Sequence, residues 1–375
     1  MRLTFQYRLC PSKSQRTQMI EILESCRWVY NEALATRKNA WEQEQKSISH
    51  YDTIKLLPGW KKQKSELREV YSQVLQEVCT RVDLAFQAFF RRIKAGEKPG
   101  YPRFRGYGRY DSFTYPQTGF ELTKEGLKLS KIGTIKIILH RPICGNIKTL
   151  NIRRDAVGNW YANFSCEVEQ EPLPVSEKAI GIDVGLESFV TLSNGEKVIN
   201  PRFFRKDENE LAKAQHKLSK AEKGTPERAK RRKAVQHIHK RITNRRKDFT
   251  HKLSHQLVNE YGIIALEKLN NKNMLQNHHL AKSISDAAWN QFIQYITYKA
   301  ECAGREIVLV DPRNTSKRCS RCGTLVEKSL SVRVHKCPVC GLEIDRDENA
   351  AINILALGLQ CLGASPRSHP IHGAE

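Results

Sequence analysis

Two Cys-x-x-Cys-Gly motifs place the tightest constraint on how this chain can fold. Cys319 and Cys322 form the first motif, and Cys337 and Cys340 form the second, 14 residues further along the chain. Four thiolates at this spacing suit one tetrahedral Zn²⁺ ion, and the glycine after each pair permits the tight turn around the metal. Because protein ligands fill all four positions, the expected zinc ion is structural. A redox-active dithiol is the less favoured alternative.

The charge balance indicates a polyanionic partner. The chain carries 63 lysines and arginines against 40 aspartates and glutamates, a formal net charge of +23. Such an excess opposes compaction unless a polyanion neutralises it, so nucleic acid is the first expected partner. The excess is concentrated in residues 205–252, which hold 17 basic and 6 acidic side chains. A basic enzyme without a nucleic-acid partner is the alternative interpretation.

Three features indicate a soluble, cytoplasmic protein, associated with the nucleoid if it binds DNA. No run approaches 18 apolar residues, and the N-terminal residues contain no signal-peptide core. The odd number of cysteines, 11 in total, argues against a framework of disulfide bonds.

Hydrophobic periodicity predicts an α+β chain with several domains. The first half is expected to hold a strand at 2–9, helical stretches from about 15 and at 65–93, and several short strands within 112–169 that form a small barrel or sheet. The second half is expected to hold three strands within 178–199, a basic helical pair within 204–260 broken at Gly224 and Pro226, a strand at 262–267, a helix at 285–303, a strand at 306–310 and a last helix from about Asp347.

Residues 91–110 predict a loop that contacts nucleic acid. Glycine and proline preclude a long helix there, and arginine alternates with tyrosine and phenylalanine. Basic groups neutralise phosphates and aromatic rings stack on bases. An ordinary solvated loop is the alternative. The arginines expected to make the contacts are Arg91, Arg92, Arg103 and Arg105.

Three acidic residues are candidates for a metal-dependent hydrolytic site. Asp183 lies mid-strand among apolar residues, Glu267 ends an apolar strand, and Asp347 lies at the start of the last helix. Hydrolysis of a phosphodiester by two metal ions needs converging carboxylates, and a buried charge is costly unless it binds something. Each acid also has an ordinary interpretation: a turn residue, a partner of Lys268, or a helix N-cap, the last open to Asp345 as well.

Three segments of the second half resemble, in order, the RuvC motifs and the zinc ribbon of the TnpB proteins: GIDVGLESFVTLSNG, IIALEKLN and TSKRCSRCG…CPVCG…DRDENAAINIL. Bacterial and archaeal insertion sequences encode this family, which is related to the type V CRISPR effectors. The first half is similar to the same family in MRLTFQYRLCPSKSQ, CRWVYNEAL and AFQAFFRRIKAGEKPGYPRF. The resemblance covers about residues 1–360.

The resemblance implies an RNA-guided DNA endonuclease. A transposon-derived guide RNA would pair with double-stranded target DNA beside a short motif that the protein reads, and both strands would be cut by two-metal hydrolysis. A transposase, or a nuclease-silent RNA-guided DNA-binding regulator, is the alternative. A transposase encoded by the same element is a further expected partner.

The resemblance also assigns residues. Asp183, Glu267 and Asp347 would be catalytic and would hold two Mg²⁺ ions, with Asp183 bridging both; the products would carry 5′-phosphate and 3′-hydroxyl ends. Asp347 is preferred to Asp345 because the aspartate of the family lies two residues before the asparagine, here Asn349. The contacts implied for reading the motif are Tyr71, Ser72, Gln73, Gln76 and Thr114.

The domain layout follows from the same resemblance. An RNase H-like (RuvC) nuclease domain with an inserted zinc ribbon would follow a β-barrel wedge domain that is interrupted by a helical recognition domain. The expected bounds are 1–14 and 106–172 for the wedge domain, 15–105 for the recognition domain, 173–314 and 343–362 for the nuclease domain, 315–342 for the zinc ribbon and 363–375 for a disordered tail.

Overall fold

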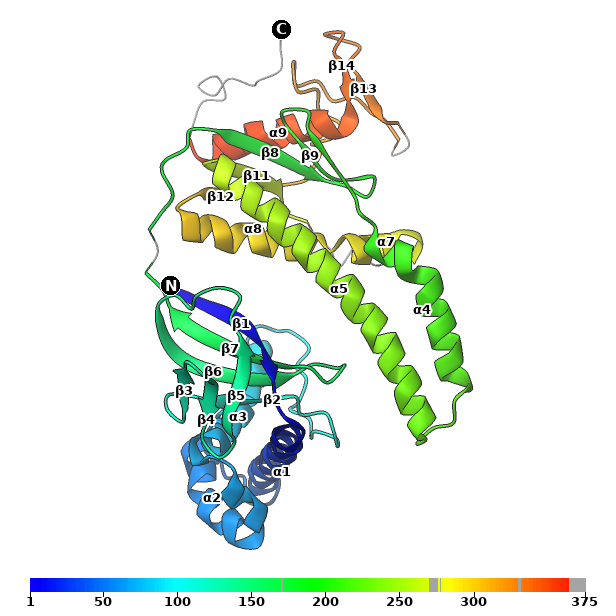
Figure 1. Cartoon of the computed structure of the whole chain (residues 1–375). Helices are drawn as coiled ribbons and strands as arrows, with labels where there is room; N and C mark the ends of the chain where they lie inside the picture. The colour runs from blue at the N-terminus through cyan, green and yellow to red at the C-terminus, as the bar shows by residue number, and fades with distance from the viewer. Residues whose placement is uncertain (170, 270–275, 277, 330–331, 364–375) are drawn as a thin grey trace. The chain divides into compact units, whose positions relative to one another are not determined.

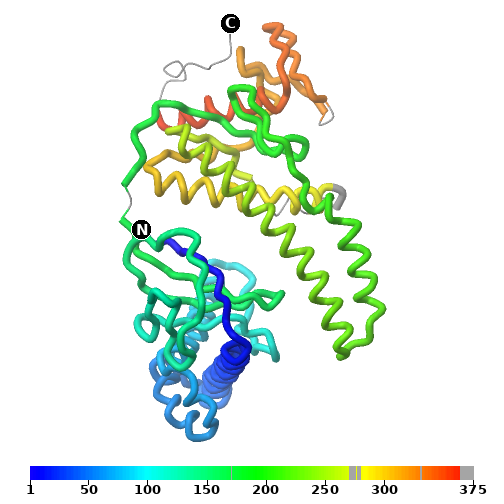
Figure 2. The backbone as a smooth tube through the Cα atoms, in the orientation of Figure 1, coloured from blue at the N-terminus to red at the C-terminus, as the bar shows by residue number. Residues whose placement is uncertain are grey.

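The computed structural model describes residues 1–169, 171–269, 276, 278–329 and 332–363 of the chain (Figure 1). The chain divides into two compact units, Met1–Glu169 and Gln170–Glu375. Each unit combines a β-sheet with helices (Figure 2), which confirms the expected α+β class. The expected disordered tail, 363–375, lies outside the described residues except for Gly363.

The first unit is built on a seven-stranded antiparallel sheet. Its central strand is β1 (Arg2–Cys10), which pairs with β7 (Trp160–Glu167) on one side and β5 (Gly133–Ile138) on the other. The edges approach each other, since the Tyr115 ring lies 6.4 Å from the Phe120 ring on the opposite edge strand. The sheet is therefore nearly closed. The order is β2-β6-β7-β1-β5-β4-β3, with β2 at Ser112–Tyr115, β3 at Phe120–Thr123, β4 at Gly126–Leu129 and β6 at Asn146–Arg154.

The helices of the first unit lie between β1 and β2 in the sequence. A capping box between Ser12 and Gln15 starts α1 (Lys13–Glu44). One face of this helix is buried, at Leu23, Cys26, Val29, Tyr30 and Leu34. The remaining helices are α2 (His50–Gln63), the 3₁₀ helix Ser65–Glu69 and α3 (Ser72–Lys94).

The prediction of one helical stretch over 65–93 was wrong at one point. Val70 and Tyr71 adopt extended ψ angles of 134° and 129° between the 3₁₀ helix and α3. The Val70 side chain is buried in the core, as are Val74 and Val78 within α3, so the apolar spacing continues through a residue whose backbone is not helical.

The second unit holds a five-stranded mixed sheet in the order β10-β9-β8-β11-β12. Strand β8 (Ala179–Val184) pairs antiparallel with β9 and parallel with β11 (Ile263–Glu267), which in turn pairs parallel with β12. Parallel strands covered on both faces read as continuous apolar runs, and Ile264, Ala265 and Leu266 are all buried. The other strands are β9 (Ser188–Leu192), β10 (Lys197–Ile199) and β12 (Glu306–Val310).

Helices cover the two faces of this sheet (Figure 1). One face packs against α5 (Pro226–Glu260) and α8 (Trp289–Ala303), and Ile182 and Leu266 belong to that core. The other face packs against α9 (Arg346–Cys361), where Ala265 contributes to a second core with Ile354. Helix α4 (Phe203–Lys220) pairs with α5, and Thr225 caps α5 with Pro226 in its first turn, which confirms the predicted break.

The predicted helix at 285–303 is divided in the structure. Helix α7 (His278–Ala287) ends before Ala288, which adopts the left-handed conformation with φ 54° and begins α8. The short strands β13 (Val334–Lys336) and β14 (Glu343–Asp345) pair within the cysteine segment.

Gly181 on β8 permits the close approach of α9. A Cβ atom at this position would lie 2.1 Å from the Ala351 carbonyl oxygen and 2.7 Å from the Leu355 backbone nitrogen. Because backbone atoms cannot move aside independently, we expect Gly181→Ala to lower the free energy of unfolding by about 2–3 kcal/mol, measured by urea denaturation. Gly59→Ala is the control, since a Cβ at this exposed helical glycine meets nothing within 4 Å. Equal stability of Gly181→Ala and wild type would contradict this packing.

Candidate active site and zinc site

The three candidate acids share one face and one end of the second sheet. Side chains alternate along a strand; Gly181 and Ala265 face α9, and therefore Asp183 and Glu267 do so too. The register pairs Ile182 with Leu266, so the two acids follow at adjacent positions on neighbouring parallel strands. Asp347 lies in the first turn of α9, above this face.

The electrostatics of Asp183 reflect this convergence. Asp183 is half-buried. Its pKa is raised well above the usual value, first by burial and then by the negative charges of Glu267 and Asp347. A carboxyl group under these influences ionises only with difficulty unless a cation compensates. The site therefore has the electrostatic character of a cation-binding cluster.

Glu267 is held by Thr315 and not, as one alternative had it, by Lys268. The Thr315 hydroxyl donates to Glu267 Oε1 at 2.5 Å, and it lies 3.2 Å from the Pro312 carbonyl oxygen. Burial raises the pKa of Glu267, and the hydrogen bond from Thr315 lowers it in part. Reasoning from the sequence missed Thr315, although it begins the TSKRC segment of the third motif.

The structure separates the roles of Asp345 and Asp347. Asp345 is the N-cap of α9, since it accepts the backbone N–H groups of Asp347 at 3.0 Å and Glu348 at 3.2 Å. It also pairs with Lys197 at 2.7 Å. Burial alone would raise the pKa of Asp345, but Lys197 and the helix N–H groups lower it below its usual value. The alternative of a simple N-cap therefore applies to Asp345.

Two arginines neutralise Asp347. Oδ1 accepts hydrogen bonds from Arg346 Nε at 2.9 Å and Nη2 at 2.8 Å, and Oδ2 lies 3.7 Å from Arg333 Nη1. Over the described ranges, the four cysteines are the one group of three or more possible ligands whose donor atoms all lie within 4.8 Å of one another. The carboxylate oxygens of Asp183, Glu267 and Asp347 are therefore not all within 4.8 Å of one another, although the three residues are neighbours.

The four cysteines do converge as predicted. The Sγ atoms of Cys319 and Cys340, and those of Cys322 and Cys337, are each 3.5 Å apart. A Zn–S bond of about 2.3 Å implies about 3.8 Å between sulfurs of a tetrahedral site, whereas a disulfide needs about 2.05 Å. Gly323 and Gly341 adopt positive φ angles of 78° and 71° in the two turns. The cluster suits zinc.

Two buried asparagines join α9 to the zinc site. Asn349 Nδ2 donates to the Arg318 carbonyl oxygen at 2.8 Å and its Oδ1 accepts from the Ser320 N–H at 3.0 Å. One turn later, Asn353 Nδ2 donates to the Thr315 carbonyl at 2.8 Å. The same helix therefore presents Asp347 and holds the segment that carries Thr315 and Cys319. An asparagine pair at i and i+4 on an apolar helix was the available signal.

Four of the five residues expected to read the motif lie at the start of α3. The Tyr71 and Thr118 hydroxyl groups are hydrogen-bonded at 2.9 Å. The Thr118 hydroxyl also donates to Gln73 Oε1 at 3.2 Å. Ser72 Oγ accepts from Lys61 at 2.9 Å, and Gln76 is exposed.

The other expected contacts are separate from this group. Thr114 on β2 accepts from Arg81 at 2.7 Å and from Asn151 at 2.9 Å, so it is bonded within the unit. The predicted contact loop is irregular after Lys94, whereas residues 91–94, also predicted as loop, belong to α3. Its arginines are exposed: Arg91 and Arg92 in the last turn of α3, and Arg103 and Arg105 in the loop.

No helix among the described residues is both long and apolar enough to span a lipid bilayer.

Three family models match the chain. One described as a probable transposase matches residues 163–278, and one described as a Cas12f1-like TNB domain matches 289–354. A third, described as a helix-turn-helix domain, matches 1–46, where this structure has strand β1 and the single long helix α1.

Known proteins match along almost the whole length. The chain is 39% identical over 363 residues to a putative RNA-guided DNA endonuclease of Streptomyces pristinaespiralis, covering 95% of this chain and 89% of that protein. It is 30% identical over 375 residues to the putative RNA-guided DNA endonuclease InsQ of Escherichia coli, covering 94% and 92%. A solved Cas12f1–sgRNA–target DNA complex is similar in fold, with a TM-score of 0.57 at 16% identity, covering 92% and 83%. The chain thus belongs to the family that its motifs indicated, the insertion-sequence-encoded TnpB proteins.

Proposed function

We propose that this protein is an RNA-guided DNA endonuclease of a transposable element. The observation that carries the proposal is the convergence of Asp183, Glu267 and Asp347 on one face of a sheet, in a chain 39% identical to a protein named a putative RNA-guided DNA endonuclease. A guide RNA pairs with target DNA beside a short motif that the protein reads, and the site cuts both strands. The net charge of +23 suits two polyanionic partners.

The acids suit two Mg²⁺ ions because hard cations prefer carboxylate oxygens. Asp183, Glu267 and Asp347 would hold the ions. Bound Mg²⁺ supplies activation of the attacking water and stabilisation of the leaving oxygen. Thr315 orients Glu267, and Arg346 orients Asp347. Arg333 is half exposed, so its contact with Asp347 can be exchanged at little cost. The products carry 5′-phosphate and 3′-hydroxyl ends.

The domain assignment is part of the proposal. Strand β1 is central in the first sheet although three α-helices and a 3₁₀ helix separate it from β2 in sequence. This supports a wedge barrel (1–14 and 106–172) interrupted by a recognition domain (15–105). The mixed five-stranded sheet supports an RNase H-like nuclease domain (173–314 and 343–362), and the cysteine cluster supports a zinc ribbon at 315–342. The protein works in the cytoplasm at the nucleoid, alongside a transposase of the same element.

The decisive experiment purifies the protein with its bound RNA and sequences that RNA. We expect a transcript that ends at the boundary of the element. The complex is then given Mg²⁺ and a plasmid that carries a guide-matched target. Double-strand breaks support the proposal; binding without breaks would instead indicate the silent regulator, and joined strand-transfer products would indicate a transposase.

A further inference from the structure

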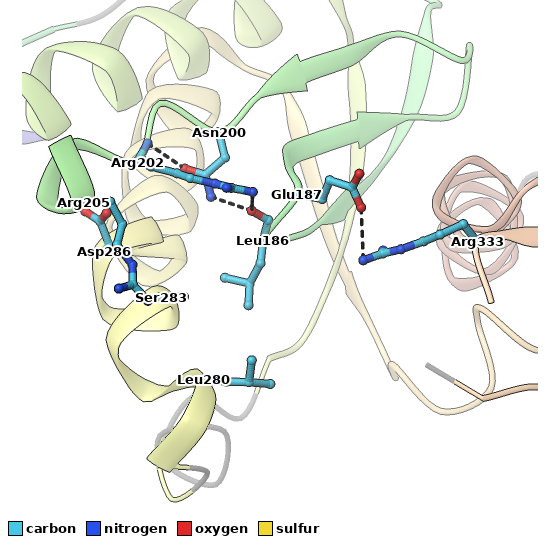
Figure 3. Close-up of a pocket in the computed structure, with 9 residues that line it drawn as sticks. All are labelled: Leu186, Glu187, Asn200, Arg202, Arg205, Leu280, Ser283, Asp286 and Arg333. Carbon is cyan, nitrogen blue, oxygen red and sulfur yellow. Dashed lines mark hydrogen bonds and ion pairs between the residues drawn. The ribbon is translucent and has the colours of Figure 1, made fainter. Parts of the chain in front are cut away.

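Figure 3 shows a hollow of about 690 Å³ in the second unit. It lies beside the acid cluster, because its lining residue Arg333 contacts Asp347. One side is formed by Leu186 and Glu187, which follow Asp183 on the turn after β8. Another side is formed by Arg333, whose guanidinium lies 3.0 Å from Glu187 and 3.7 Å from Asp347. Apart from Arg333, none of the residues that line this hollow has a role in the proposed hydrolysis.

Arg202, which lines the hollow, has a strained backbone conformation. Arg202 adopts the left-handed conformation with φ 46° and ψ 51° where α4 begins, which costs a non-glycine residue about 1 kcal/mol. Its N–H donates to Asn200 Oδ1 at 3.1 Å, and Asn200 Nδ2 donates to the Leu186 carbonyl at 3.0 Å. Arg202 Nη2 reaches the same carbonyl at 3.5 Å. These bonds hold the guanidinium against the turn that follows Asp183; strain of this kind is found at functional sites.

The hollow presents net positive charge. Its two carboxylates are already paired, Glu187 with Arg333 and Asp286 with the Phe204 N–H and Arg246, both at 3.0 Å. Arg205 contacts Glu208 at 3.1 Å in a partly exposed pair, and Glu208 is shared with Lys282. Water and salt weaken such a contact. Arg202 and Arg205 are therefore available to an anion that enters from solvent.

An apolar pair completes the lining. The side chains of Leu186 and Leu280 point toward each other across the hollow (Figure 3). Nucleotides need both surfaces, because cations bind the phosphates while apolar side chains contact the base. Pockets that bind small ligands have volumes of about 300–1,000 Å³, so the hollow has room for a ligand of nucleotide size.

We propose that this hollow seats a nucleotide of the DNA strand being cut, next to the scissile phosphate. Arg202 and Arg205 bind its phosphates, and Leu186 and Leu280 contact its base. The inference rests on the proposed function and deepens it, since it requires the strand to enter the site unpaired. These arginines are substrate-binding residues that set the register of the strand on the acids.

The first test removes the two charges. We compare Arg202→Gln/Arg205→Gln with wild type as full guide-RNA complexes, in single-turnover cleavage of a saturating target. Loss of two charge-assisted contacts should slow cleavage by about 10- to 100-fold, with guide-RNA affinity and target-duplex affinity unchanged. Lys206→Gln, an exposed neighbour outside the hollow, should cut at the wild-type rate. Arg202→Lys/Arg205→Lys should restore most of the rate.

The second test removes the charge from the substrate. Neutral methylphosphonate linkages replace single phosphates around the cut site. Wild type should slow at one or two positions, and the double glutamine variant should show no additional slowing there, because the contact is already lost. As a readout without cleavage, 2-aminopurine at the seated nucleotide should change fluorescence in the Asp183→Asn complex, and Leu280→Ala should abolish the change.

The outcomes separate this inference from the proposed function. If wild type cuts and the double glutamine variant cuts equally fast, the hollow does not seat the strand, and the proposed function stands. If the double variant instead loses guide-RNA affinity, the hollow holds RNA and the inference is overturned. If wild type fails to cut guide-matched DNA, the proposed function fails, and the fluorescence experiment still decides whether single-stranded DNA occupies the hollow.

Discussion

Asp183→Asn is expected to abolish DNA cleavage while the complex still binds guide RNA and target. Asparagine keeps the shape of the side chain but removes the charge at the centre of the acid cluster, where Glu267 and Asp347 act on Asp183. Loss of a carboxylate that holds both ions should lower the single-turnover rate by about 10³-fold or more. The measurement is plasmid cleavage with Mg²⁺, together with gel-shift titrations of RNA and DNA.

Asp345→Asn is the matched control for this substitution. It makes the same chemical change two residues from Asp347, but at the N-cap of α9, and asparagine caps helices about as well as aspartate. Cleavage should therefore stay within a few-fold of wild type. Residual Mg²⁺-dependent cutting by pure Asp183→Asn, or complete loss in Asp345→Asn, would contradict the assignment.

The stability of Asp183→Asn supplies an independent check. In the folded protein the pKa of Asp183 is raised, whereas the unfolded chain has the usual pKa of about 3.9. In Mg²⁺-free buffer, wild type should therefore lose stability relative to the variant as pH rises from about 4 to the raised pKa, by about 1.4 kcal/mol per unit. Below pH about 4 the carboxyl is neutral in both states, and the stability difference should no longer change with pH.

Cys337→Ser is expected to remove the zinc ion and, with it, cleavage. Structural zinc binding contributes about 10–16 kcal/mol in isolated zinc-finger peptides, so losing one of four ligands should destabilise this segment by several kcal/mol. The segment that begins the zinc site carries Thr315, which bonds Glu267, and Asn349 and Asn353 fasten it to α9. Zinc content by mass spectrometry, thermal melting and cleavage should fall together.

Cys361→Ser is the control for the zinc prediction. Cys361 is an exposed cysteine at the end of α9 and is not part of the four-cysteine cluster. It should keep one zinc ion per chain and the wild-type cleavage rate. Full activity in zinc-free Cys337→Ser would show that the zinc segment does not support the acids, and zinc-free wild type would show that the cysteines serve another purpose.

Local sequence motifs predicted much of the secondary structure. The Cys-x-x-Cys-Gly pairs specified their own geometry because a tetrahedral ion and two positive-φ glycines leave few arrangements. The break between α4 and α5 followed from Thr225 and Pro226, which start a helix by local chemistry. The break at Val70 and Tyr71 did not, because Val70 keeps the apolar spacing of the helix that follows and is buried like Val74.

The candidate acids were also predicted only in part from the sequence. Their types and positions at strand and helix ends were readable along the chain, as was the family. Which face Asp183 and Glu267 occupy was not, because a strand that is buried on both sides shows no alternation. Only the packing of α9 on Gly181 and Ala265 decides this. The same packing brings Asp347 to them. Other tertiary contacts form the arginine-lined hollow, because its lining comes from residues 186–205, residues 280–286 and Arg333. Local pattern encodes conformation, whereas a site assembled from remote side chains exists only once tertiary contacts form.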